Sequence, residues 1–120
     1  MGGYKLDNNP RHFARATETL LKQDLSDINF FNKNYQDISV GKGNVIYCDP
    51  PYRIKNHYRI KFDHDQFYDW TKYASRDNIV LISEYWMPPE FTCIWEKPML
   101  INANPNHQVK RIERLFIYNP

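Results

Sequence analysis

Glycine is scarce in this sequence, which has four glycines in 120 residues. Gly2 and Gly3 precede no strand, loop and helix pattern, and Gly41 and Gly43 lead into an apolar run rather than a helix. A nucleotide-binding loop needs glycines between a strand and the following helix, because the backbone must approach the phosphates closely. None of these glycines fits such a loop.

Cysteine is also scarce, and its spacing excludes the common zinc and redox motifs. Cys48 and Cys93 lie far apart without a CxxC pattern, each inside an apolar run. We therefore expect both to be buried free thiols. The four histidines are scattered among polar residues without ligand spacing, so we predict no metal site.

Long apolar runs and a large excess of one charge are missing as well. No run approaches the roughly 20 residues that span a bilayer, and the first residues lack a signal-peptide pattern, so we expect no membrane association and a cytoplasmic location. Sixteen basic and fourteen acidic residues leave a net charge of +2, which identifies no partner. The hydrophobic content of 42% and aromatic content of 16% are enough for one packed core.

The N-terminal half of the chain contains one helix pattern and two short apolar runs. Asn9 as N-cap and Pro10 predict a helix over residues 10–23, with an apolar stripe that includes Phe13 and Leu20. Residues 28–31 are expected to form a short strand. Residues 45–48 form a continuous apolar run, typical of a strand buried on both faces of a parallel sheet.

The C-terminal half continues the alternation of helix and strand. We expect a loop over residues 53–61, followed by a helix capped by Asp63, whose Phe67, Trp70, Tyr73 and Ala74 share a face. The sequence then predicts a buried strand over 79–83 and two antiparallel strands over 92–96 and 111–118, joined by a loop over 102–108. This order indicates an α/β fold with a mostly parallel sheet and an antiparallel C-terminal edge.

Asp49-Pro50-Pro51-Tyr52 directly follows the apolar run at residues 45–48. Ligands of α/β sheets bind beyond the carboxyl ends of the strands, so this tetrapeptide is the leading site candidate. The alternative is a rigid turn that ends the strand, in which Asp49 caps nearby N–H groups. Ser83-Glu84-Tyr85 ends the next predicted strand and either walls the same pocket or caps the following segment.

The apolar run and tetrapeptide together resemble the signature of amino-methyltransferases that use S-adenosylmethionine. The order of the downstream segments is similar to the C-terminal half of Dam-type (D12 class) DNA adenine-N6 methyltransferases, and the similarity covers nearly the whole chain. These segments are His57-Tyr58, residues 62–70, residues 80–85 and residues 113–118. The resemblance implies a partial Rossmann-like methyltransferase fold, with double-stranded DNA as substrate and a setting in restriction-modification or in a phage or prophage.

The tetrapeptide suits the chemistry that the resemblance implies. The exocyclic amine of adenine is a poor nucleophile because its lone pair is delocalised into the ring, and acceptors on both N6 protons would localise that pair. The Asp49 carboxylate and the Pro50 carbonyl are such acceptors, and Pro51 has no N–H group to compete. The ring of Tyr52 offers a base a stacking contact of roughly 1 to 3 kcal/mol.

The resemblance assigns further residues to the cofactor and to DNA. Asn34 and Tyr35, with Asp49, are expected to hold the cofactor S-adenosylmethionine; a surface turn with a half-buried tyrosine is the alternative. Candidate phosphate and base contacts flank the tetrapeptide, and a solvated loop is their alternative. These candidates are Arg11, Arg53, Lys55, Asn56 and Tyr58.

The sequence departs from the family in two respects, because the family's Phe-x-Gly-x-Gly cofactor loop is missing and most of the segment that recognises the DNA target is expected to be missing too. We expect residues 1–23 to be the end of a target-recognition segment with its helix, and residues 24–120 to be the sheet portion. A fragment, one half of a split enzyme and a decayed paralogue remain open, and the last would be a non-catalytic module that binds DNA or a partner. A homo-oligomer or a complementary N-terminal half is the expected partner, because half a sheet exposes apolar faces.

Overall fold

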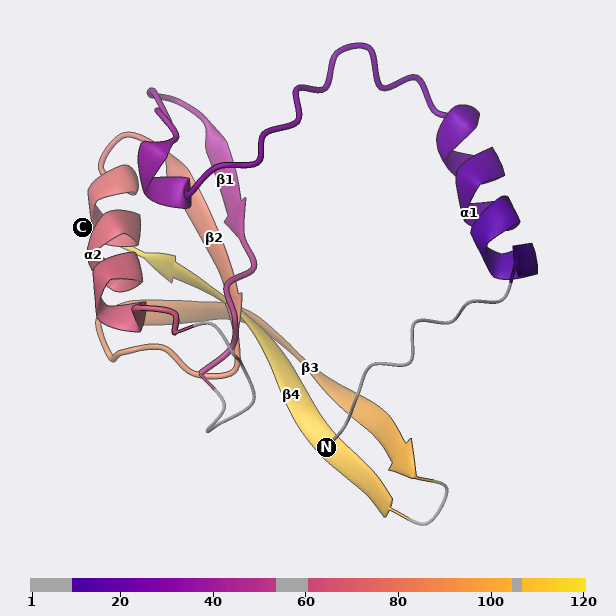
Figure 1. Cartoon of the computed structure of the whole chain (residues 1–120). Coiled ribbons are helices and arrows are strands. Elements are labelled where there is room, and N and C mark those ends of the chain that lie inside the picture. Colours follow the sequence, from indigo (N-terminus) through magenta and orange to yellow (C-terminus); the bar gives the residue numbers. More distant parts are fainter. Residues whose placement is uncertain (1–9, 54–60, 105–106) are drawn as a thin grey trace. The chain divides into compact units, whose positions relative to one another are not determined.

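The computed structural model describes residues 10–53, 61–104 and 107–120, without the side chains of residues 10, 12, 13, 101–104 and 107–109 (Figure 1). The chain divides into two compact units, Met1–Lys33 and Asn34–Pro120. The predicted loop over residues 53–61 lies mostly outside the described residues.

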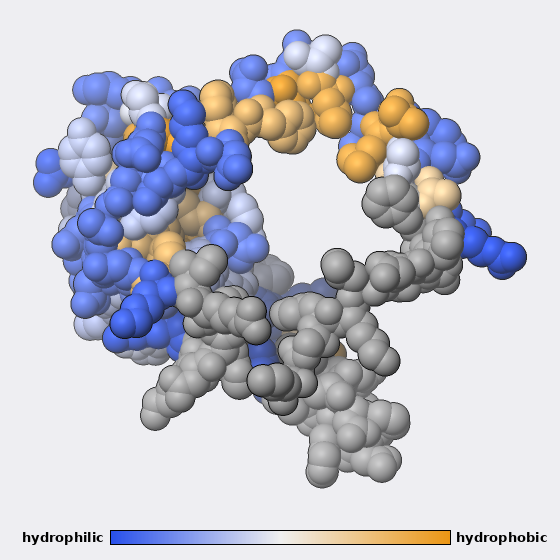
Figure 2. Space-filling model, in the orientation of Figure 1, coloured by the Kyte–Doolittle hydropathy of each residue, from blue (hydrophilic) through white to orange (hydrophobic). Residues whose placement is uncertain are grey.

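The first unit contains helix α1 (Pro10–Leu21). The helix begins at the predicted proline and ends two residues before the predicted end at residue 23. The predicted strand over residues 28–31 is wrong, because this segment is in neither a helix nor a strand. Ile28, Phe30 and Phe31 are exposed, and Figure 2 shows apolar side chains along the segment between α1 and the short helix η1 (Tyr35–Asp37). A strand needs a neighbour to satisfy its backbone hydrogen bonds, which local sequence cannot supply.

The second unit is a four-stranded sheet in the order β1-β2-β4-β3. The strands are β1 (Val45–Cys48), β2 (Ile79–Glu84), β3 (Phe91–Asn104) and β4 (His107–Tyr118). β1 and β2 are parallel, whereas β4 is antiparallel to both β2 and β3. The mixed α/β class and the antiparallel C-terminal pair are confirmed, but the expectation of a mostly parallel sheet is wrong. Helix α2 (His64–Ala74) lies in the crossover between the parallel strands β1 and β2, whereas only two residues separate the antiparallel strands β3 and β4.

The C-terminal hairpin is longer than predicted. β3 runs to Asn104 and β4 starts at His107, so most of the predicted loop over residues 102–108 is paired strand. The two strands continue away from the core as a ribbon (Figure 1), where polar residues are tolerated on both faces. The loss of apolar alternation therefore did not mark the end of the strands.

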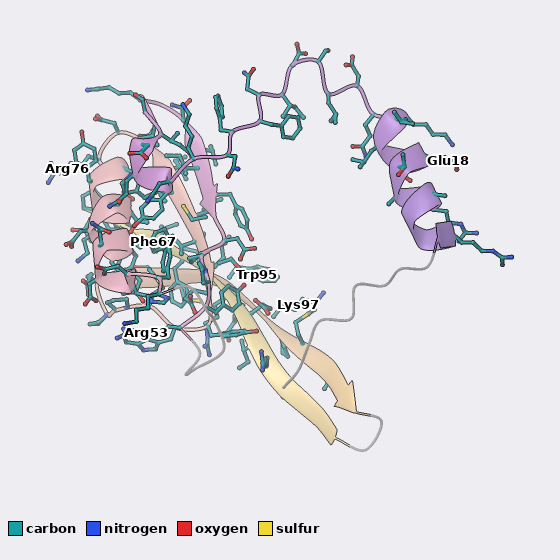
Figure 3. All side chains as sticks on the ribbon, viewed as in Figure 1. Glu18, Arg53, Phe67, Arg76, Trp95 and Lys97 are labelled. Atoms are coloured by element: carbon teal, nitrogen blue, oxygen red, sulfur yellow. The ribbon has the colours of Figure 1, made fainter. Side chains whose placement is uncertain are left out.

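Helix α2 (His64–Ala74) covers one face of the sheet (Figure 1). Its predicted cap is confirmed, since the Asp63 side chain accepts a hydrogen bond from the backbone N–H of Gln66 at 3.0 Å. Phe67 lies between the helix and the strands (Figure 3). Of the residues predicted to share a face, Phe67 and Ala74 are buried, whereas Tyr73 is 65% exposed. The buried residues of the helix are Phe67, Tyr68, Thr71 and Ala74.

β1 is an edge strand with one face exposed, which corrects the expectation of a strand buried on both faces. Ile46 and Cys48 pack against the core, whereas Val45 and Tyr47 point the other way and are exposed. The expectation of two buried thiols is wrong for Cys93, which lies in the exposed part of β3; both cysteines are free. Burial raises the pKa of the half-buried Cys48 to about 11.

Candidate active site

The tetrapeptide forms a loop at the carboxyl end of β1. Asp49 is exposed, Pro50 is buried, and Pro51 and Tyr52 are half-buried. β1 pairs in parallel with β2, so Asp49 and Ser83 follow the last paired residues, Cys48 and Ile82. Parallel pairing therefore brings the two segments singled out in the sequence to the same edge of the sheet.

The hydroxyl of Tyr52 is held by two side chains. It donates a hydrogen bond to Glu113 Oε2 at 3.0 Å and lies 2.7 Å from Ser83 Oγ. Because its single proton goes to Glu113, Ser83 is the donor in the second contact. Burial raises the pKa of Tyr52 to about 12, aided by Glu113 and opposed by the hydrogen bond with Ser83. The ring meets Tyr85 edge-on at a centroid distance of 4.5 Å.

Two further hydrogen bonds fix the backbone of the loop. The carbonyl of Pro51 lies 2.9 Å from His64 Nε2, which donates because a carbonyl only accepts. The N–H group of Arg53 donates to Glu84 Oε1 at 3.3 Å, and the N–H group of Tyr85 donates to the same oxygen at 3.0 Å. The loop is thus attached to α2, β2 and β4 through side chains.

Glu84 is 1% exposed, and its Oε2 has no hydrogen-bond partner among the described residues. Burial raises the pKa of this carboxyl, while the hydrogen bonds from Tyr85 and Arg53 and the nearby His64 work against the shift. Burying a carboxylate with only one of its oxygens hydrogen-bonded costs folding free energy. Glu84 nevertheless lies beneath the loop, where its other oxygen holds two backbone N–H groups.

A cavity of about 330 Å³ lies beside the loop, and most of its walls are apolar. Aromatic rings form one side: Tyr35 lies 5.2 Å from Trp70 and 5.6 Å from Phe67, in both cases edge-to-face. Asp49, Pro50 and Pro51 also line the cavity. A carboxylate at the rim of an aromatic cavity suits a flat heterocycle that carries hydrogen-bond donors.

Two of the three residues expected at the cofactor, Tyr35 and Asp49, line this cavity. The side chain of Asn34 instead accepts a hydrogen bond from the N–H group of Gln36 at 3.1 Å and caps the short helix η1 (Tyr35–Asp37). Asn34 therefore fixes the start of the turn that positions the Tyr35 ring.

The residues expected to contact DNA lie in different parts of the chain. Arg11 is exposed in the first unit, and Arg53 directly follows the tetrapeptide. Lys55, Asn56 and Tyr58 lie outside the described residues. Within the parts that are described, no group of three or more histidine, cysteine or acidic side chains could hold a metal ion.

Sequence reasoning missed three residues around the loop: His64, Glu113 and Trp86, whose ring centre lies 5.7 Å from the guanidinium carbon of Arg53. His64 belongs to no motif, and only the predicted start of a helix after Asp63 indicated its position. Glu113 reaches Tyr52 across 61 residues through the pairing of β4 with β2, which no local pattern specifies.

A family model supplies the relationship to known proteins. The model of the D12 class N6 adenine-specific DNA methyltransferases matches residues 2–83 of the 120-residue chain, and thus includes Tyr35, the tetrapeptide and Ser83. No curated protein and no solved structure matches the chain. No helix in the described ranges has the length and apolar character needed to cross a membrane.

Proposed function

Because the chain belongs to the D12 class of N6 adenine-specific DNA methyltransferases, we propose that it carries the part of the catalytic domain that holds the target adenine. The reaction is transfer of a methyl group from S-adenosylmethionine to adenine N6 in double-stranded DNA. The observation that supports this proposal most is the fixation of the Asp49–Arg53 loop by side chains from three elements.

This fixation matters because N6 becomes nucleophilic only when acceptors are already in place. The Asp49 carboxylate and the Pro50 carbonyl would accept from the two N6 protons, and Tyr52 would stack on the base. Preorganised dipoles need no rearrangement as charge develops on N6, which makes them more effective than water. In a duplex N6 is paired, so the adenine must first leave the base stack.

The aromatic cavity fits the adenine part of the cofactor. Tyr35 would pack against the ring, and Asp49 would lie where the cofactor and the target base meet. When bound, S-adenosylmethionine would supply the methyl group: its bond to sulfur would break as the bond to N6 forms, and N6 would lose one of its two protons. The 120 residues contain no glycine-rich loop for the methionine part, so we propose that a complementary segment supplies it.

The exposed face of β1 supports the proposal of a complementary segment, and it also supports a second candidate function. Val45, Tyr47 and Ile79 are 66%, 63% and 59% exposed, and Val45 and Ile79 are partners in the parallel pairing of β1 with β2. Apolar residues gathered in this way mark an interaction surface. The complementary segment would extend the sheet into a Rossmann-like methyltransferase fold; the second candidate is a non-catalytic module that binds DNA or a partner protein through this face.

Calorimetry with S-adenosylmethionine on this chain tests the cofactor site. We expect binding by the wild type and at least a tenfold weaker affinity in Tyr35→Ala. Tyr73→Ala is the matched control, because this exposed tyrosine lies on α2 outside the cavity lining. Circular dichroism establishes that the variants fold. Equal affinities of Tyr35→Ala and the wild type would place the cofactor elsewhere.

Transfer of tritiated methyl groups to duplex DNA tests the reaction. We expect little activity from this chain alone, and N6-methyladenine when the N-terminal part of a complete D12-class enzyme is co-expressed. Persistent inactivity together with retained DNA binding would favour the non-catalytic module.

A further inference from the structure

Trp86 is an exposed aromatic residue that lies two residues after the end of β2, the strand that supports the site loop, Asp49–Arg53. It is 53% exposed, although its neighbours Glu84 and Met87 are 1% and 5% exposed. These two buried side chains fix the backbone on both sides of Trp86. The indole is therefore presented to solvent from a fixed position rather than from a free loop.

Arg53 lies against this indole. Its guanidinium carbon is 5.7 Å from the centre of the Trp86 ring, within the range of a cation–π contact. The N–H group of Arg53 is itself bound to Glu84, so one buried carboxylate holds the backbone of the arginine and lies two residues before the tryptophan. The pair is assembled from two segments that are distant in sequence, as expected of a site rather than of a chance contact within a turn.

The pair also lies next to the residue expected to stack on the target base. Tyr85, which precedes Trp86, contacts the ring of Tyr52 edge-on at 4.5 Å, and Arg53 directly follows Tyr52. Arg53 and Trp86 thus each follow, in the chain, one of two tyrosines whose rings are in contact. An indole and a guanidinium plane are the side chains on which unstacked nucleobases pack most readily, while the arginine also neutralises phosphate.

We propose that Trp86 and Arg53 form a stacking platform for a nucleobase next to the target adenine, with its phosphate close to the guanidinium group. This inference rests on the proposed function, because it takes DNA as the ligand. A base that leaves the duplex disrupts the stacking of its neighbours, and the platform would compensate for that loss on one side.

Tryptophan fluorescence reports on this contact directly, since a stacked base quenches the indole. The chain has three tryptophans, and Trp95 is a matched control because it is 51% exposed but lies on β3. The probe is a short DNA duplex with one unpaired adenine. We expect quenching in the wild type and in Trp95→Phe, and its loss in Trp86→Phe. In fluorescence anisotropy with the same labelled duplex, Trp86→Ala should bind roughly 5- to 150-fold more weakly, the loss that removing one stacked aromatic gives, and Trp95→Ala should bind as the wild type does.

The outcomes separate this inference from the function on which it rests. If the wild type binds the duplex but Trp86→Ala binds equally well, or if quenching persists in Trp86→Phe, the platform is disproved and the proposed function stands. If the wild type binds no duplex, the DNA-binding part of the proposed function fails and the platform fails with it. Circular dichroism of each variant excludes unfolding as the cause of lost binding.

Discussion

The Nε2 atom of His64 lies 2.9 Å from the carbonyl oxygen of Pro51. His64 is the first residue of α2, directly after the capping residue Asp63. Its ring also packs edge-on against Phe62 at 5.0 Å, which fixes its orientation. The start of the helix and the turn of the site loop are therefore one structural unit.

Replacing His64 by Ala should remove the donor to Pro51 and loosen the loop. We expect a loss of about 1 kcal/mol in the free energy of unfolding, the usual net value of one hydrogen bond. His64→Gln keeps a donor at a similar distance and should recover part of this loss. Urea denaturation of the three proteins measures the effect, and identical midpoints for His64→Ala and the wild type would show that the contact does not hold the loop.

Tyr52→Phe should lower the stability of the protein although the substitution keeps the aromatic ring. Stacking on a base needs the ring and not the hydroxyl, so methyl transfer by this variant should change little. In the structure the hydroxyl meets both Ser83 and Glu113, and its removal leaves two part-buried groups without this partner. We expect about 1 to 3 kcal/mol lower unfolding free energy in thermal or urea denaturation. Tyr47→Phe, at an exposed tyrosine of β1, is the control and should change little.

Glu84→Gln should gain stability relative to the wild type as the pH rises. The pKa of Glu84 is raised in the folded protein, so the folded state holds this proton more tightly than the unfolded state. Wild-type stability therefore falls as the pH rises from the ordinary carboxyl pKa to the raised one, and stays lower above it. A glutamine side chain keeps an oxygen that accepts from the N–H groups of Arg53 and Tyr85, but it does not titrate.

The comparison is the unfolding free energy of Glu84→Gln minus that of the wild type, measured between pH 4 and pH 8. Other titrating groups, such as Glu90, whose pKa is lowered mainly by its hydrogen bond with Lys72, contribute equally to both proteins and cancel. A difference that is flat or falls with pH would show that burial does not raise the pKa of Glu84 in the folded protein.

The apolar face of β1 should drive association of this chain. Val45 and Tyr47 lie on this face, and Ile79 of β2 is in register with Val45. Sedimentation velocity should show self-association that increases with concentration, and Tyr47→Lys should reduce it, because a charge on this face opposes contact. Arg76→Ala, at the far end of α2 from Arg53 (Figure 3), is a surface control. A monomer at all concentrations would argue against an interface on this face.

Local sequence was sufficient for features that depend on neighbours along the chain. The cap at Asp63, the start of α1 at Pro10 and the strand that ends before Asp49 all follow from propensity and from short spacings. The strand expected at residues 28–31 failed because pairing is a long-range property, and the same limit hid the contact between Glu113 and Tyr52. The site loop was thus predictable, but the side chains that hold it were not.

Asp49→Ala should abolish most methyl transfer once the missing part of the enzyme is supplied. The carboxylate is one of two proposed acceptors for N6, and loss of one preorganised group of this kind raises the barrier by about 3 kcal/mol, which is of order a hundredfold in rate. Asp49→Asn keeps the size and one acceptor oxygen, so its rate should lie between those of Ala and the wild type. Because Asp49 is exposed, neither variant should alter folding, and circular dichroism provides that control. The assay is tritiated methyl transfer to duplex DNA with identification of the modified base. Full activity in Asp49→Ala, or methyl groups on cytosine instead of adenine N6, would disprove the role assigned to this carboxylate.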